Sequence, residues 1–512
     1  MPSLSKKCLG RYLAVLFFIF IIVQIQARAT QYFVAPTGND LNAGTMDSPF
    51  ATITKAQSVM VAGDTTYVRG GLYALGATIT LNKSGTAGNR LNLFAYAGER
   101  PVLDFSQMVV GPSNRGIRLQ GWYWTIRGLD IKGAGDNGMQ IDNGAYSVVE
   151  HCAFYENRDT GLQLSNGAAY NEIINCDSYN NADTAQGNAD GFAPKLDVGT
   201  GNYFFGCRAW NNSDDGFDGY MRGADSVVTV MENCWIFSNG YLANGTASSG
   251  NGNGFKMGGM DLLTDSLRHN ITLINCLAFD NRVKGFDQNN NRGSMTLLNC
   301  TGYRNGTNFS IPGPLKSGSV ATITNGLVLG SAGSLAAHVV QTTNSWMPQF
   351  TVTSGDFLNI DTTGVRGPRQ PDGSLPDLGF MHLAQGSPLI NAGTDVGHPF
   401  NGSGPDLGCF ESDFPVSVQN PHTSPLAFTL HQNYPNPFNP NTTITFSILQ
   451  PAMTSLKIYD ILGREMATLV HRELTPGPYE FMWDGQGHSS GTYVYRLVSG
   501  SDVQSNTMTL MK

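Results

Sequence analysis

Acidic and basic side chains stand at fixed distances from a series of Gly-Phe steps in the middle of the chain. The steps that align are Gly191-Phe192, Gly216-Phe217 and Gly254-Phe255. Asp190 and Asp215 hold the position before the glycine, and Asp214 precedes Asp215. Asp218 and Lys256 hold the position two residues after it. If the steps belong to stacked copies of one repeat, equivalent residues lie about 4.8 Å apart, the spacing of hydrogen-bonded strands. The alignment therefore predicts that these side chains form one cluster.

Four carboxylates on two neighbouring turns would repel one another unless a cation lay between them. Calcium suits such a set, because it takes about six to eight hard oxygen ligands in flexible geometry. Zinc is disfavoured, since no histidine or cysteine accompanies the aspartates. The alternative is that these are solvated turn aspartates, which are common because Asp bonds its own backbone. The clustering favours calcium.

Lys256 lies one repeat beyond the acidic cluster and could act as a base. An elimination next to a carboxylate needs a cation on that carboxylate, a base near the adjacent C–H, and a means of carrying the enolate charge. Calcium can meet the first and third needs, and a neutral lysine the second. Flanking aspartates favour the protonated lysine, so an alkaline rate optimum is expected. The alternative is a surface lysine that pairs with Asp218 or Asp287.

Further basic residues on the same coils could bind carboxylates of an acidic polymer. They are Lys195, Lys284, Arg282 and Arg292. They could equally be solvated charges that discourage strand addition at an edge, and both interpretations stay open. None of the nine histidines has a metal-binding partner at suitable spacing, and no Gly-x-Ser-x-Gly motif occurs.

A sixfold pattern of cysteine, aromatic residue and asparagine identifies the repeat that would position these side chains. The copies are Cys152/Tyr155/Asn157, Cys176/Tyr179/Asn181, Cys207/Trp210/Asn212, Cys234/Phe237/Asn239, Cys276/Phe279/Asn281 and Cys300/Tyr303/Asn305. A repeat that is regular in residue type but variable in length is typical of a stacked solenoid whose insertions leave on loops. The expected fold class is therefore all-β, with a solenoid of short strands.

The alternation of neighbouring residues places each of these cysteines on the inner face of a coil. A free cysteine packs there as a small hydrophobe, although the coil spacing would also permit disulfides. A ladder of buried thiols is the favoured interpretation. The asparagines are expected to form a second inner ladder by bonding one another's amides and the backbone. Both ladders are interpreted as structural.

The two ends of the chain differ from the repeats. Residues 1–29 are typical of a secretory signal peptide, with Lys6, Lys7 and Arg11 before an apolar stretch and an Ala-x-Ala site ending at Ala29. That stretch is shorter than the roughly 18–20 residues of a membrane span, and no later segment could cross a bilayer, so a soluble, exported protein is expected. The solenoid is predicted over residues 30–415, a linker over 416–426, and a small β-sandwich over 427–512. The net charge of −8 argues against a nucleic-acid partner.

The C-terminal segment resembles the sorting domains of the type IX secretion pathway. The matching stretches are residues 430–440 (LHQNYPNPFNP), 458–464 (IYDILGR) and 491–496 (GTYVYR). The resemblance implies a Gram-negative host and export across the outer membrane, to the cell surface or the medium. A carbohydrate-binding sandwich is the alternative, but Trp483 is the only tryptophan available there as a platform.

Residues 31–415 resemble family 9 polysaccharide lyases, which are right-handed parallel β-helix enzymes that cleave pectate by β-elimination. The matching stretches are residues 32–40 (YFVAPTGND), 188–196 (NADGFAPKL), 212–218 (NSDDGFD) and 252–257 (GNGFKM). The resemblance implies that Asp190, Asp214, Asp215 and Asp218 bind Ca²⁺ and that Lys256 is the catalytic base.

Together these expectations describe a secreted, calcium-dependent pectate lyase that acts as a monomer on α-1,4-linked polygalacturonate. Three alternatives remain. One is a lyase on another uronate polymer such as rhamnogalacturonan. Another is a glycosidase that uses paired carboxylates such as Asp214 and Asp215. The third is a non-catalytic surface adhesin that binds polysaccharide without cutting it.

Overall fold

The computed structural model describes residues 29–260, 267–413, 428–448, 452–474 and 477–511. The predicted linker and all but the last residue of the predicted signal peptide lie outside these ranges. The chain separates into two compact units, Met1–Val416 and Ser417–Lys512. No helix in the described ranges is both long and apolar enough to span a membrane.

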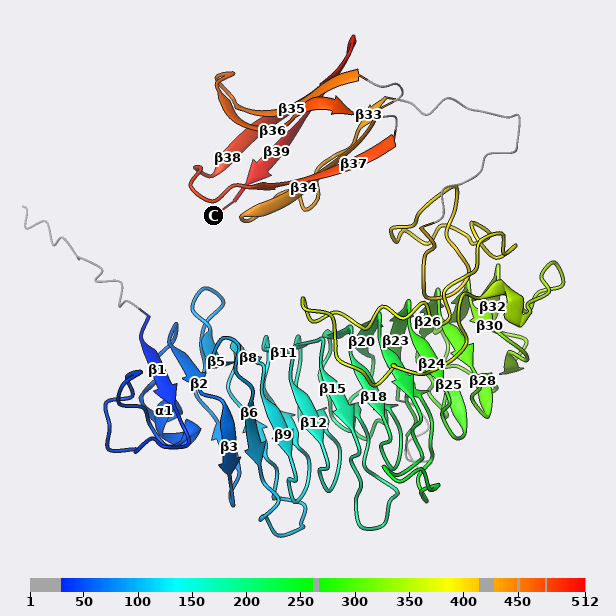
Figure 1. Cartoon of the computed structure of the whole chain (residues 1–512). Helices are drawn as coiled ribbons and strands as arrows, with labels where there is room; N and C mark the ends of the chain where they lie inside the picture. Colours follow the sequence, from blue (N-terminus) through cyan, green and yellow to red (C-terminus); the bar gives the residue numbers. More distant parts are fainter. Residues whose placement is uncertain (1–28, 261–266, 414–427, 449–451, 475–476, 512) are drawn as a thin grey trace, which may run out of the picture. The chain divides into compact units, whose positions relative to one another are not determined.

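The first unit is a parallel β-helix built from three sheets, which successive coils extend strand by strand (Figure 1). The first sheet contains β1 (Gln31–Val34), β2 (Thr65–Val68), β5 (Leu91–Ala95), β8 (Trp124–Arg127), β11 (Val148–Glu150), β14 (Glu172–Ile174), β17 (Asn202–Phe205), β20 (Val227–Glu232), β23 (His269–Ile274), β26 (Met295–Leu298), β29 (Ala321–Thr324) and β32 (Val340–Thr342). The second sheet contains β4 (Ile79–Leu81), β7 (Ile117–Leu119), β10 (Met139–Asp142), β13 (Leu162–Ser165), β16 (Phe192–Pro194), β19 (Phe217–Asp218), β22 (Phe255–Lys256), β25 (Lys284–Asp287), β28 (Thr307–Ile311) and β31 (Gly333–Leu335). The third sheet contains β3 (Gly71–Ala74), β6 (Pro101–Asp104), β9 (Asp130–Lys132), β12 (Ala153–Tyr155), β15 (Asp177–Tyr179), β18 (Arg208–Trp210), β21 (Trp235–Phe237), β24 (Leu277–Phe279), β27 (Thr301–Tyr303) and β30 (Leu327–Val328).

A short helix, α1 (Ile53–Val59), closes the N-terminal end of the solenoid. The hydroxyl of Thr52 caps it by accepting a hydrogen bond from the amide of Lys55 at 3.0 Å. Ile53 and Ala56 are buried against the first coils. The helix thus covers the apolar end of the solenoid, as an open stack of coils requires.

The asparagine ladder forms as predicted. The side-chain amide of Asn181 donates to Oδ1 of Asn212 at 2.8 Å, and that of Asn212 donates to Oδ1 of Asn239 at 3.0 Å. The same pattern links Asn157 to Asn181 and Asn239 to Asn281. These side chains are almost fully buried, so the ladder satisfies polar groups that would otherwise be stranded inside the coil corners.

The six repeat cysteines are buried and free of disulfides, as the favoured interpretation predicted. Each thiol contacts a backbone carbonyl of the preceding coil, as Cys207 does with Ile173 O at 3.3 Å. Inward-facing phenylalanines form a parallel stack on the second sheet. The ring centroid of Phe286 lies 5.1 Å from that of Phe255 and 4.7 Å from that of Phe309. The second sheet therefore rests on a packed interior that fixes its register.

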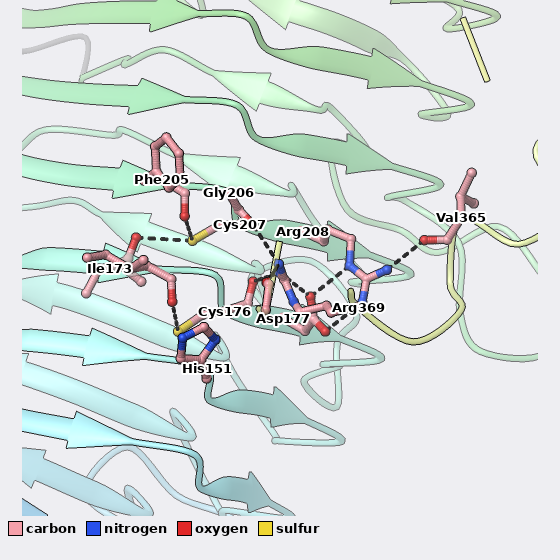
Figure 2. Close-up of polar contacts among 12 residues, drawn as sticks. His151, Ile173, Cys176, Asp177, Phe205, Gly206, Cys207, Arg208, Val365 and Arg369 are labelled. Atoms are coloured by element: carbon pink, nitrogen blue, oxygen red, sulfur yellow. Dashed lines mark hydrogen bonds and ion pairs between the residues drawn. The ribbon is translucent and has the colours of Figure 1, made fainter. Parts of the chain in front are cut away.

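The coils end earlier than expected. Residues 343–413 contain no named strand, only the 3-10 turn η2 (Ser354–Asp356), and they lie against the third sheet. Figure 2 shows where this segment is held: Arg369 reaches Asp177 at 2.7 Å, and Arg208 bonds both Asp177 and the carbonyl of Val365. This segment covers part of the third sheet, whereas Asp218 and Lys256 stand on β19 and β22 of the second sheet.

The second unit contains two antiparallel sheets. One contains β33 (Thr429–Leu430), β34 (Asn441–Ile448) and β37 (Gly477–Asp484). The other contains β36 (Glu465–Leu474), β35 (Ala452–Asp460), β38 (Gly491–Ser499) and β39 (Asp502–Leu510). The alternation of apolar residues in the sequence predicts strands at residues 443–449, 455–459, 479–483 and 492–497, which fall on β34, β35, β37 and β38. It missed β36 and β39, whose exposed faces blur the apolar alternation.

Candidate functional site

A cleft of about 400 Å³ lies over the second sheet. Its lining includes Asp214, Asp218, Lys195 and Lys256 from the predicted set. The pairing of β19 with β22 places Asp218 beside Lys256, and the pairing of β22 with β25 places Lys256 beside Asp287. Successive side chains of a strand point to opposite faces of the sheet. The phenylalanine of each Gly-Phe step therefore points inward, while the residue after it faces the cleft.

Three carboxylates converge around Asp214, which lines this cleft. Oxygens of Asp190, Asp214 and Asp215 all lie within 4.8 Å of one another. The amide of Asp215 donates to Oδ1 of Asp190 at 3.1 Å, which ties the two neighbouring coils together. Asp190 and Asp215 are fully buried.

Lys256 lies against this group. Its Nζ is 3.0 Å from Oδ2 of Asp215 and 3.2 Å from Oδ1 of Asp218, and the residue is 6% exposed. Burial opposes the charge on Lys256, but Asp218 and Asp215 outweigh it, so the pKa of Lys256 is raised well above its ordinary value. Lys256 is therefore a buried, charged lysine and not the solvated surface residue considered as an alternative.

Lys195 is a second buried ammonium in the cluster. Its Nζ lies 2.7 Å from Oδ2 of Asp190 and 3.4 Å from Oδ2 of Asp218, and the residue is 5% exposed. Burial alone would lower the pKa of Lys195, but Asp190 and Asp218 raise it above its ordinary value. Lys195 thus bridges carboxylates of two coils, a geometry that orients them.

The carboxyl groups of this cluster have shifted pKa values. Burial, followed by repulsion from Asp215 and Asp190, raises the pKa of Asp214 to about 9. Burial also raises the pKa of Asp190 to about 7, although Lys195 opposes the shift. Asp218 differs: burial would raise its pKa, but Lys256 and Lys195 together hold it below the ordinary value.

The donor set fits a hard divalent cation. Asp215 Oδ2 is buried without a hydrogen-bond partner among the described residues, and Nζ of Lys256 lies 3.0 Å from it as an ion pair. Asp190, Asp214 and Asp215 offer converging oxygens, and their pKa values are raised first by burial and then by neighbouring aspartates. Calcium relieves repulsion among such carboxylates with oxygen ligands alone. The fourth predicted ligand, Asp218, lies between the two lysines at the edge of this group.

The other predicted basic residues lie outside the described lining of this cleft. Lys284 pairs with Asp287 at 2.9 Å. Arg282 donates to the carbonyl of Gly250, and Arg292 donates to the carbonyl of Pro314 at 2.9 Å. Each of the three has a protein partner, so of the four residues only Lys195 reaches the cleft.

Sequence reasoning missed part of the lining, above all Arg115, Asp136, Asn137 and Asp159. A signal for them was present. Arg115 and Asn137 precede Gly116 and Gly138, the same position that Asp190 holds before its own glycine, and β10 pairs in register with both β7 and β13. Extending the glycine alignment towards the N-terminus would have placed them on the same face.

Comparison with known proteins identifies both units. A family model described as a Pel9A-like, right handed beta helix region matches residues 32–320. The model of the secretion system C-terminal sorting domain matches residues 432–510, so the second unit is a sorting domain of that type.

Individual relatives cover most of the first unit. Pectate lyase L of Dickeya dadantii is 39% identical over 394 residues, which span 74% of this chain and 90% of the relative. Pectate lyase PEL9 of Emericella nidulans is 32% identical and spans 72% of this chain and 95% of its own.

Solved structures agree. The crystal structure of pectate lyase Pel9A matches with a TM-score of 0.69 at 38% identity, covering 75% of this chain and 96% of that one. A rhamnogalacturonan lyase matches with a TM-score of 0.56 at 27% identity, covering 70% and 97%. The chain belongs to the Pel9A-like right-handed β-helix family of polysaccharide lyases.

Proposed function

We propose that the protein is an exported, calcium-dependent pectate lyase that cleaves α-1,4-linked polygalacturonate by β-elimination. Lys256 is the base, and Asp190, Asp214, Asp215 and Asp218 hold Ca²⁺. One observation carries the proposal: a buried lysine amine lies 3.0 and 3.2 Å from two carboxylates of the neighbouring coil, inside a cleft on the second sheet. The pectate lyases among its relatives support the choice of substrate.

The proton and the bonds that change in the proposed elimination determine the role of each residue. A proton leaves C5 of the uronate for Nζ of Lys256, its electron pair forms the C4–C5 double bond, and the C4–O bond to the leaving sugar breaks. The departing oxygen takes up a proton, and the product carries an unsaturated non-reducing end. When bound, calcium would acidify the C5–H by neutralising the uronate carboxylate and would stabilise the developing enolate.

Lys256 must be neutral to accept this proton, and the carboxylates around it favour its charged form. Carboxylates that are occupied in binding a divalent cation hold an ammonium less strongly, so calcium favours the neutral amine as well. Lys195 keeps its ion pairs to Asp190 and Asp218 and thereby orients two of the ligands. The two lysines therefore have different roles: Lys256 moves a proton, and Lys195 positions carboxylates.

The C-terminal sorting domain supports delivery to the cell surface or the medium. The implied partners are an acidic plant cell-wall polysaccharide and the outer-membrane secretion machinery of a Gram-negative host. We propose that the enzyme acts as a monomer, since the cleft is complete within one chain.

The test follows ultraviolet absorbance and reducing ends of polygalacturonate at alkaline pH, with calcium, with chelator and with Lys256→Ala. A rise in absorbance that both chelator and the substitution abolish is the expected result. Reducing ends without new absorbance would make the protein a hydrolase. Binding without either change would make it an adhesin.

A further inference from the structure

The end of the cleft away from Lys256 carries buried polar atoms that have no hydrogen-bond partner among the described residues. They are Nε of Arg115, Oδ2 of Asp136 and Oδ1 of Asn137, and all three residues line the cleft. Asn137 is only 2% exposed. Nε of Arg115 faces Oδ2 of Asp136 across 3.4 Å, an ion pair without hydrogen-bond geometry. Because a buried acceptor without a donor is destabilising, this end of the cleft is suited to a ligand that brings donors.

The register places these atoms near the metal ligands but not among them. Asn137, Thr160 and Asp190 hold the position before the glycine on three successive coils, as the pairing of β10 with β13 and of β13 with β16 requires. Two coil spacings separate Asn137 from Asp190, roughly 10 Å at the strand spacing. A polymer whose reacting unit lay at Lys256 and the carboxylate cluster could therefore set another unit against Asn137.

The two ends of the cleft differ in charge. Asp136 and Asp159 occupy equivalent positions on adjacent coils at the Asn137 end, where Arg115 pairs with Asp136 and Lys195 attracts the carboxylate of Asp159 from the next coil. The ammonium group of Lys256 lies three coils beyond Asp159, at the carboxylate cluster. A free carboxylate at the Asn137 end would meet two like charges, whereas a hydroxyl group would find three side chains with acceptor oxygens.

We propose that Asp136, Asn137 and Asp159 form a sugar subsite that binds a unit without a free carboxylate through its hydroxyl groups. The inference rests on the proposed function, because it takes the cleft to hold a uronate polymer. Such a unit can be a methyl-esterified uronate or a neutral sugar that alternates with uronate. The substrate class is then a polymer in which a charged unit at the carboxylate cluster is accompanied by an uncharged unit nearby.

Binding can be measured without turnover in the full-length Lys256→Ala protein with calcium. The ligands are an unesterified oligogalacturonate, a partly methyl-esterified one, and an oligosaccharide in which uronate alternates with a neutral sugar, each titrated calorimetrically. Asp136→Asn and, separately, Asp159→Asn are introduced into this protein, since each keeps the side-chain shape and an acceptor but removes the charge. Asp372→Asn, at an exposed aspartate outside the cleft, is the matched control.

We expect at least one uncharged-unit ligand to bind more tightly than the unesterified one, and the preferred ligand identifies the source of that unit. Asp136→Asn or Asp159→Asn should tighten binding of the unesterified ligand on the order of fivefold, by removing one like charge at about 4 Å. Binding of the preferred ligand should change less than twofold. The proposed subsite would be overturned if the two substitutions changed the binding of all ligands equally or weakened binding of the unesterified ligand. It would also be overturned if no ligand bound at all. The proposed function is tested separately, by the ultraviolet absorbance that the unsubstituted enzyme produces from polygalacturonate.

Discussion

Nζ of Lys256 lies 3.0 Å from Oδ2 of Asp215, a fully buried carboxylate oxygen that has no hydrogen-bond partner among the described residues. The amine and the carboxylate come from adjacent coils, so neither is positioned by its own turn alone. The pair joins the proposed base directly to the proposed metal site. Whatever changes the charge on Asp215 therefore changes the proton affinity of Lys256.

Replacing Lys256 by alanine should lower kcat by a factor of about 10²–10⁴, the usual contribution of a positioned general base. Formation of unsaturated product, followed by ultraviolet absorbance at saturating calcium, measures the effect. Lys132→Ala is a matched control, because Lys132 forms a surface ion pair with Glu156 on the third sheet. Activity that survived in Lys256→Ala and fell in the control would remove Lys256 from the mechanism.

The rate should rise with pH by up to about tenfold per pH unit, because only the neutral form of Lys256 accepts a proton and its pKa is raised by Asp218 and Asp215. Raising calcium to saturation should move the profile towards lower pH, since calcium engages the same carboxylates. The measurement is kcat/KM against pH at two calcium concentrations. A rate that did not depend on pH above neutrality would argue against an amine base.

Calcium binding should release protons near neutral pH. Burial and neighbouring carboxylates raise the pKa of Asp214 to about 9 and that of Asp190 to about 7. Asp214 therefore holds a proton at pH 7.5 that calcium must displace when it binds. Affinity should therefore increase as the pH rises towards about 9. Calorimetry in buffers of different ionisation enthalpy gives the number of protons released. The Asp214→Asn variant should bind calcium more weakly and release fewer protons on binding. Binding heats of the unsubstituted protein that were identical in all buffers would contradict the assignment of the released proton to Asp214.

The sequence was sufficient to predict the stacked residues of the site, because a repeat of fixed side-chain type converts alignment into spatial proximity. Asp190 beside Asp215, and Asp218 beside Lys256, follow from the glycine register alone. The hydrogen-bond and ion-pair partners of individual side chains could not be predicted from this register. Lys195 was considered for substrate binding, yet it is buried between Asp190 and Asp218, because rotamers and burial depend on the depth of the cleft and not on register. The end of the coils was also misplaced, since residues 343–413 keep apolar residues without keeping strands.

Asn212→Ala should destabilise the solenoid by about 3 kcal/mol or more, because it leaves buried donors and acceptors unpaired on both neighbouring coils. Asn212 accepts from the amide of Asn181 at 2.8 Å and donates to Asn239 at 3.0 Å. Chemical denaturation monitored by circular dichroism gives the free energy of unfolding. Asn244→Ala, in an exposed loop, should change it little. Equal stabilities of the two variants would show that the ladder contributes nothing.

His269 should make the solenoid sensitive to acid. It is fully buried on β23, where Nδ1 contacts the carbonyl of Gly219, next to Asp218, at 2.8 Å, and Nε2 contacts the hydroxyl of Thr229 at 2.8 Å. Burial lowers the pKa of His269 from 6.5 to about 4, so the unfolded chain binds a proton at a higher pH than the folded one. The stability that the neutral ring provides is thus complete above about pH 6.5 and is lost as the pH falls towards 4, at a cost of about 3 kcal/mol.

Unfolding free energies of the unsubstituted protein, His269→Gln and His338→Gln, measured from pH 7.5 to 4.5, test this prediction. His338 is exposed and serves as the matched control. The advantage of the unsubstituted protein over His269→Gln should shrink as the pH falls, because the glutamine cannot take up a proton, whereas its difference from His338→Gln should stay nearly constant. Calcium affinity should fall in His269→Gln, since the ring fixes the backbone that follows Asp218. A constant difference between the unsubstituted protein and His269→Gln across this range would mean that the buried ring does not titrate on unfolding.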